Sequence, residues 1–151
     1  MAETSFLYVT YIATTPEKLW EALTREDISK KYFFGRFLRS EWKEGSTFQL
    51  MRDKGQIDHH GTVLKYAPNR LLILKWNVPD EDGLEERFSK VTFELHPMDS
   101  AVKLTLKHED LLPQDFSEET DTFNAFNNGW PAILSNLKSL LETGRTLRPI
   151  S

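Results

Sequence analysis

Cysteine is absent from the 151 residues of this chain. Its absence excludes disulfides, thiol nucleophiles and thiolate metal ligands, and it is compatible with a reducing compartment. A long apolar run is also missing, because no segment reaches the roughly 20 apolar residues that span a bilayer. The first residues, MAETSFLYVTYIA, carry Glu3 where a signal peptide needs positive charge, and their apolar run is short. We therefore predict a cytoplasmic protein without a membrane span.

An excess of positive charge is missing too. The chain has 19 Lys and Arg against 23 Asp and Glu, which gives a net charge of -4. General binding of nucleic acid needs a strongly basic face, so we expect no nucleic-acid partner. Hydrophobic residues at 39% and charged residues at 28% are ordinary for a globular protein. The length predicts a single domain over residues 1–151, large enough to bury a core.

The N-terminal half predicts one strand, two short helices and then more strands. The segment from Ser5 to Ala13 is rich in β-forming residues and is read as the first strand. In TTPEKLWEALTRED, Thr15 suits an N-cap and Pro16 suits the first helical position. A second short helix is expected from about Asp27 to Phe33. Alternating apolar residues then predict antiparallel strands, with turns at KEGS and at APNR.

The segment SKVTFELHPMDSAVKLTLKHED predicts a β-hairpin, because apolar and polar residues alternate on both of its strands. The apolar rows are Val91, Phe93 and Leu95 on the first strand, and Val102, Leu104 and Leu106 on the second. Successive residues of a strand point to opposite faces, so each strand has one core face. His108 shares the parity of the second apolar row and is expected to point inward.

The C-terminal region carries an apolar stripe with spacings of three and four residues, which predicts a helix from about Ser117 to Gly144. Pro131 falls inside the stripe without a phase break, so we expect one helix, roughly 40 Å long, with a kink at the proline. The order of elements predicts an α+β protein with the helix-grip, START-like fold. In that fold a curved antiparallel sheet, here of about six or seven strands, surrounds a long C-terminal helix.

Four stretches of the chain resemble one known family. They are ATTPEKLWEALTREDISKKYF, GTVLKYAPNRLLILKW, the VTFEL…VKLTLKHEDL hairpin and GWPAILSNLKSLLETG. In this order they are similar to the activator-of-heat-shock-protein-90-ATPase homologue family, in the START/SRPBCC superfamily with the birch-pollen-allergen-like fold. The resemblance implies a cavity between sheet and helix that can hold an apolar ligand. It also implies two other roles, a chaperone-associated or other protein-interaction module and a polyketide cyclase/aromatase-like enzyme.

Residues at core-facing positions are candidates for lining such a cavity. They are Trp42, Phe48, Leu74, Trp76, Phe93, Leu104, Leu106, His108, Phe126, Trp130 and Leu134. The alternative is that the apolar members simply fill the interior. For His108 the two readings are a hydrogen-bonded core residue, or a polar group that orients a ligand or acts as acid or base.

The sequence predicts no metal site, no cofactor and no catalytic residue. His59 and His60 in DHHG look like metal ligands, but neighbours on a strand point to opposite faces, so we expect an exposed pair. No nucleophile motif and no phosphate-binding glycine loop occurs.

We therefore favour a binding protein for a hydrophobic or aromatic small molecule. A protein-interaction module and a cyclase-like enzyme with His108 as acid or base are the alternatives. A large cavity in which His108 and Arg52 converge would favour the enzyme. A filled interior with an exposed apolar or charged patch would favour the interaction module.

Overall fold

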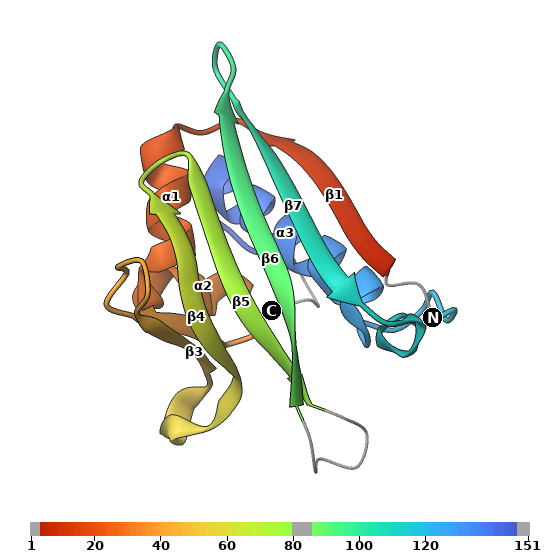
Figure 1. Cartoon of the computed structure of the whole chain (residues 1–151). Helices are drawn as coiled ribbons and strands as arrows, with labels where there is room; N and C mark the ends of the chain where they lie inside the picture. Colours follow the sequence, from red (N-terminus) through yellow and green to blue (C-terminus); the bar gives the residue numbers. More distant parts are fainter. Residues whose placement is uncertain (1–3, 80–85, 148–151) are drawn as a thin grey trace.

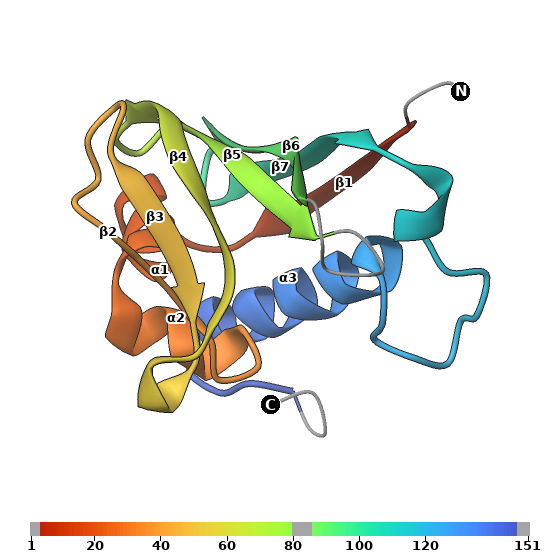
Figure 2. The same cartoon turned by 60° about the horizontal axis from the view of Figure 1, so that its bottom comes forward.

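The computed structural model describes residues 4–79 and 86–147, and it contains one antiparallel sheet of seven strands (Figure 1). The sheet order is β1-β7-β6-β5-β4-β3-β2. The strands are β1 (Thr4–Ile12), β2 (Phe37–Ser40), β3 (Thr47–Met51), β4 (Ile57–Ala67), β5 (Leu71–Pro79), β6 (Glu86–Pro97) and β7 (Val102–Leu111). The helices are α1 (Pro16–Thr24), α2 (Glu26–Tyr32) and α3 (Phe126–Thr143), with short 3-10 turns η1 (Asp53–Gly55) and η2 (Pro113–Asp115). The sheet curves around α3, which confirms the predicted helix-grip fold (Figure 2).

The two short helices form where the sequence predicts them. Thr15 caps α1, because its hydroxyl accepts a hydrogen bond from the Lys18 amide at 3.2 Å, and Pro16 opens the helix. The buried face of α1 includes Leu19 and Leu23, four residues apart on one side. Helix α2 follows at once and ends at Tyr32, before a left-handed Phe34 and Gly35 turn the chain into β2.

The predicted start of the last helix near Ser117 is wrong. Helix α3 begins at Phe126, and its 18 residues span about 27 Å rather than 40 Å. The segment before it uses its polar side chains for local hydrogen bonds, which compete with helix formation. The Asn127 side chain accepts from the Ser117 amide and donates to the Ser117 carbonyl, both at 2.9 Å. Ala125 then enters the helix with a φ of 70°, a conformation that no helix contains.

Pro131 lies in the second turn of α3, and the helix continues through it to Gly144, which closes it in the left-handed conformation. The missing N–H of Pro131 removes only the bond to the carbonyl of Asn127. The stripe beyond it faces the sheet, with Ile133, Leu134 and Leu137 buried.

The core lies between α3 and the concave face of the sheet. The predicted inward rows of the last hairpin are confirmed, because Val91 pairs with His108, Phe93 with Leu106 and Leu95 with Leu104. These side chains are at most 3% exposed. The central layer is closed by further fully buried residues of β5 and α3, namely Leu72, Leu74 and Leu137. The middle of the sheet–helix interface is therefore filled with side chains.

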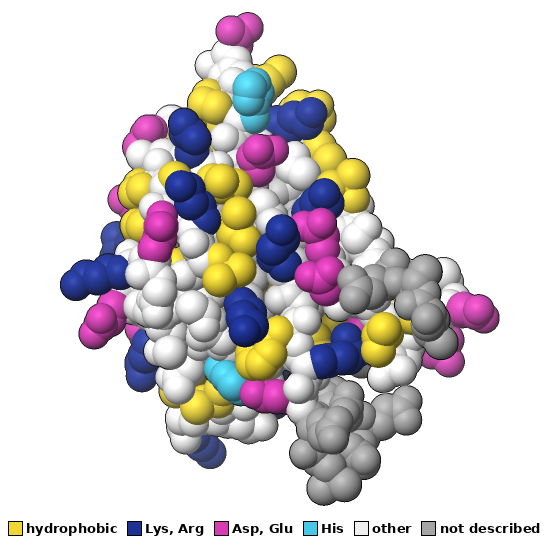
Figure 3. All heavy atoms as spheres, in the orientation of Figure 1, with side chains coloured by type: hydrophobic (Ala, Val, Ile, Leu, Met, Phe, Trp, Pro, Cys, Tyr) yellow, Lys and Arg dark blue, Asp and Glu magenta, His cyan; other side chains and the backbone are white. Residues whose placement is uncertain are grey.

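The convex face of the sheet carries lysines interspersed with acidic and apolar side chains (Figure 3). On the edge strand β1, the outward residues Leu7, Val9 and Tyr11 are 60%, 41% and 51% exposed. Among the residues that the structure describes, no helix is long and apolar enough to cross a membrane.

Candidate functional site

A cleft of about 670 Å³ opens at one end of the sheet–helix interface, where α3 begins. Its walls come from the turn after α2, from the residue after β3, from β4 and β5, from η2, and from the first two turns of α3 with the segment before them. In Figure 2 η2, the segment before α3 and the end of β5 lie near the N-terminal end of α3, beneath the curved sheet. The cleft exists because α3 starts late, so that residues 117–125 form a loop beside it instead of a further helical turn.

One wall of the cleft is aromatic. Phe33 meets Trp130 edge to face, with ring centroids 5.9 Å apart, and Phe34 packs on Phe123 at 5.8 Å. Phe126 completes this wall from the first residue of α3 and is half-buried, while Phe123 is 51% exposed. Rings held in such arrangements offer a flat apolar surface to a ligand.

A second wall of the cleft is polar and is built around Asp58, at the beginning of β4. Its carboxylate accepts hydrogen bonds from the Nε atoms of Arg36, in the α2–β2 turn, and of Arg52, which follows β3. Burial alone would raise the pKa of Asp58, but the hydrogen bonds from Arg52 and Arg36 outweigh it and hold that pKa below its usual range. Asp58 is therefore a permanent anion between two cations.

His59 stands beside this cluster and belongs to the cleft. Its Nδ1 lies 3.0 Å from the carbonyl oxygen of Asn77, and a carbonyl can only accept, so Nδ1 carries the proton. The ring packs on Trp76 at 5.1 Å and on Phe126 at 6.3 Å between centroids. Burial lowers the pKa of His59, although the hydrogen bond to Asn77 opposes that shift. Near pH 7 the imidazole is thus neutral, with Nε2 as a hydrogen-bond acceptor.

The prediction that His59 and His60 form an exposed pair is wrong for His59, which is half-buried. His60 points to the other face, as the strand period requires, and its Nε2 lies 3.1 Å from Glu86. The sequence could not reveal that Phe126, far along the chain, covers His59. In the described ranges no group of three His, Asp or Glu side chains gathers in the arrangement that a metal ion needs.

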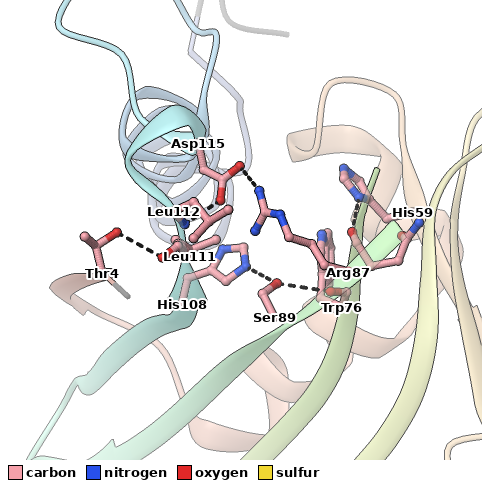
Figure 4. A network of polar contacts seen from close by, with 10 residues as sticks. Thr4, His59, Trp76, Arg87, Ser89, His108, Leu111, Leu112 and Asp115 are labelled. Atoms are coloured by element: carbon pink, nitrogen blue, oxygen red, sulfur yellow. Dashed lines mark hydrogen bonds and ion pairs between the residues drawn. The ribbon is translucent and has the colours of Figure 1, made fainter. Parts of the chain in front are cut away.

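His108 does not line the cleft and is fully buried, and Figure 4 shows its ring hydrogen-bonded to Ser89. The Trp130 indole can only donate, and its Nε1 lies 3.0 Å from Nδ1, so Nδ1 accepts and Nε2 carries the proton. Nε2 donates to the Ser89 hydroxyl at 2.7 Å, and that hydroxyl donates onward to the Trp76 carbonyl at 3.1 Å. Burial, with a smaller effect of His59, lowers the pKa of His108 to about 3. Because the histidine donates to Ser89, it does not activate that hydroxyl as a nucleophile.

Arg87 joins this buried layer to the mouth of the cleft. Its Nη2 donates to Asp115, whose other oxygen accepts from the Leu112 amide at 2.8 Å (Figure 4). Within the described part of the chain, Arg87 Nε, Arg87 Nη1 and Trp76 Nε1 are buried without a hydrogen-bond partner. Unpaired buried donors of this kind favour a hydrogen-bond acceptor nearby.

Of the residues predicted to line a cavity, Trp76, Phe126 and Trp130 line the cleft. Others fill the closed interior next to it, namely Phe48, Leu74, Phe93, Leu104, Leu106, His108 and Leu134. Trp42 lies elsewhere, stacked on Tyr66 at 6.1 Å, with its Nε1 donating to the Thr24 carbonyl at 3.2 Å. His108 and Arg52 do not converge, because His108 does not line the cleft.

Sequence reasoning missed Arg36, Asp58, His59, Phe34 and Phe123. One pair could have been predicted from the sequence. The short segment between Arg52 and Asp58 reverses the chain, and such a turn places these two opposite charges close together. The other members come from separate elements, and nothing in their local sequence links them.

Comparison with known proteins identifies the fold and the family. A search of curated proteins finds no match. Among solved structures, protein MLL2253 from Mesorhizobium loti is 25% identical, with a TM-score of 0.73 and coverage of 91% of this chain and 96% of the other. The Aha1 dimer from Colwellia psychrerythraea is 23% identical, with a TM-score of 0.70 and coverage of 93% and 98%. An Hsp90 activator from Plasmodium falciparum is 23% identical, with a TM-score of 0.69 and coverage of 91% and 95%.

The family comparison covers most of the chain. The model described as activator of Hsp90 ATPase homolog 1-like protein matches residues 13–142, from the end of β1 to the last turn of α3. This range contains every residue that lines the cleft. The chain therefore belongs to the activator of Hsp90 ATPase homolog 1-like protein family.

Proposed function

We propose that this protein binds a hydrophobic or aromatic small molecule in the cleft at the N-terminal end of α3. The observation that carries the proposal is a volume of about 670 Å³ with an aromatic wall on one side. That size lies within the usual range of about 300–1,000 Å³ for small-molecule sites, which are mostly apolar with a few polar groups. The packed centre of the interface restricts the ligand to this end of the molecule.

The arrangement supports binding without covalent chemistry. Ser89 accepts from His108 and is fully enclosed, so it offers no nucleophile to the cleft. His59 takes the orienting role that the sequence suggested for His108, because His59 lines the cleft and its Nε2 can accept a hydrogen bond from a ligand hydroxyl or amide. In this proposal the aromatic wall supplies affinity and His59 supplies orientation.

The test is a titration with aromatic compounds, followed through backbone-amide chemical shifts. We expect saturable shifts confined to the cleft residues. Phe123→Ala should weaken binding about threefold to tenfold, as expected for the loss of one aromatic contact. Phe88→Ala is the matched control, because Phe88 is also an exposed ring, at 37%, but lies outside the cleft. Absence of saturable shifts, or equal losses in the two variants, would contradict the proposal.

A second candidate function is interaction with an Hsp90 chaperone, which the family match suggests. The observation that favours it is the exposed apolar row of Leu7, Val9 and Tyr11 on the edge strand β1. An exposed edge with apolar side chains is a surface on which another protein can dock. A Val9→Lys variant should lose binding to a purified Hsp90 while it keeps binding of the aromatic ligand. Unchanged Hsp90 binding in that variant would exclude this surface.

A further inference from the structure

The polar wall of the cleft presents positive charge to a ligand, although Asp58 lies at its centre. Arg36 and Arg52 reach Asp58 from two different elements, and the side chain of Asp58 is only 13% exposed beneath them. The arginines are more accessible, at 26% for Arg36 and 46% for Arg52. The carboxylate therefore lies below, and the guanidinium groups form the surface that a ligand would meet.

Asp58 uses only a small part of the donor capacity of these arginines. Each guanidinium has five N–H donors, and Asp58 accepts from the Nε atoms alone. Arg36 Nη1 has one long contact, 3.5 Å from the Phe34 carbonyl. Among the described contacts, the two terminal nitrogens of Arg52 make no hydrogen bond. Terminal guanidinium nitrogens suit the two oxygens of a carboxylate.

The charges around the cleft are also unbalanced. Asp115 is neutralised by Arg87, and Asp58 can neutralise only one of its two arginines. One positive charge remains, and His59 is neutral near pH 7. Trp76 Nε1 adds a buried donor without a partner in this part of the described chain. A ligand with one negative charge and hydrogen-bond acceptors matches this surplus.

We propose that the cleft binds an aromatic compound that carries one carboxylate, with its ring on Phe34, Phe123 and Phe126 and its carboxylate on Arg52 and Arg36. This inference rests on the proposed function and adds the charge class of the ligand. Asp58 acts as a positioning residue, because it fixes both guanidinium groups from below. The ring and the carboxylate are then held by two different walls of one cleft.

The test compares two ligands with the same ring system, naphthoate and naphthylmethanol, each titrated against the whole chain and followed by backbone-amide chemical shifts. We expect naphthoate to bind about tenfold more tightly at low salt, as a charge-assisted hydrogen bond implies. The advantage should shrink at high salt, because the arginines are partly exposed.

Matched variants separate this cluster from the general charge of the surface. Arg52→Gln should remove most of the naphthoate advantage, so that the affinities for naphthoate and naphthylmethanol become similar. Arg39→Gln is the control, because Arg39 is an exposed arginine that pairs with Glu26 at 2.9 Å and lies outside the cleft. It should change neither affinity.

Each other outcome overturns a definite part of the argument. Equal affinity for the two compounds would overturn the charge class and leave the proposed function standing. A naphthoate advantage that survives in Arg52→Gln, or that falls equally in Arg39→Gln, would overturn the assignment to this cluster. Absence of binding by both compounds would overturn the proposed function and this inference with it.

Discussion

The two ends of the sheet–helix interface differ in the residues that build them and in how tightly they are closed. Along the later turns of α3, aliphatic side chains such as Leu134 and Leu137 meet Leu72 and Leu104 and leave almost no exposed surface. At the first turns, the aromatic rings of Phe126 and Trp130 line an open cleft together with the charged groups of Arg36 and Asp58. Aliphatic side chains interdigitate and leave no space between helix and sheet. Charged groups must stay hydrated, so they do not pack closely against the aromatic rings.

The two inward histidines show the same difference. His108, in the closed region, has both ring nitrogens hydrogen-bonded by protein groups. His59, at the open end, has one nitrogen fixed by the Asn77 carbonyl. Both are neutral near pH 7 because burial lowers the pKa of each. Only His59 has a ring nitrogen, Nε2, whose lone pair is free to accept a hydrogen bond from a ligand. The two histidines therefore differ in role because one edge of the His59 ring is exposed.

The largest expected effect is at Trp130, which belongs to both regions. Trp130→Ala should lower the free energy of unfolding by about 3–5 kcal/mol, because it removes a 3% exposed indole and leaves His108 Nδ1 without its donor. Urea denaturation measures the change. Phe123→Ala is the control at the open end, expected within about 0.5 kcal/mol of wild type. Equal losses in the two variants would erase the distinction between the closed and open regions.

A second prediction concerns pH and is of intermediate size. The pKa of His108 is about 3 in the folded chain and near 6.5 when unfolded, so below pH 6.5 only the unfolded chain takes up its proton. Stability should fall as the pH drops from 6.5 towards 3, with about 2 kcal/mol lost by pH 5 from His108 alone. His59 adds a loss of the same sign, because its pKa is lowered too. Urea denaturation between pH 7 and pH 5 measures the slope, and His108→Gln should flatten it.

Ring-proton chemical shifts keep this prediction testable even if His108→Gln folds poorly. In wild type, the His108 signals should not titrate above pH 5. A His108 ring that titrates near pH 6.5 would show that the closed region admits water.

The smallest expected effect is at Gly129, in the first turns of α3. Gly129→Ala should raise stability by about 0.5–1 kcal/mol, because alanine is the better helix former. The new Cβ would lie 3.4 Å from the Phe123 carbonyl, which is close contact without overlap. Thermal unfolding measures the change. A loss of stability would mean that the loop before α3 cannot move away from the new Cβ, and that this end of the interface is more rigid than we infer.

The sequence predicts the fold well because the fold depends on short periods. Alternation along β6 and β7 identifies the buried rows, including the inward position of His108, and Pro16 and Gly144 mark helix ends. The start of α3 is mispredicted, because the apolar stripe extends to Phe123 while Asn127 holds Ser117 in a loop. Periodicity indicates which residues could share one face of a helix. It does not indicate whether side-chain hydrogen bonds hold the same residues in a loop instead.

The candidate site is much less predictable, since its members meet only in three dimensions. Asp58 needs Arg36 from the α2–β2 turn, and His59 needs Phe126 from the far end of the chain to cover it. No local pattern links such partners, because their spacing in the sequence follows from the curvature of the sheet. Among the aromatic residues that line the cleft, the sequence predicts only Trp76, Phe126 and Trp130, whose apolar character marks them as inward-facing.

The pairing of β1 with β7 has a consequence for synthesis on the ribosome. Ile12 pairs with Val102 and Thr4 with Leu111, so the first strand to emerge has no partner until about 90 further residues have been made. At typical elongation rates of about 5–20 residues per second, β1 waits roughly 5–20 s before β7 can pair with it, and inward residues such as Ile12 stay uncovered during that time. Pairings so distant in sequence also slow folding after release. The sheet of this protein is thus expected to close on β1 only after β7 has emerged from the ribosome.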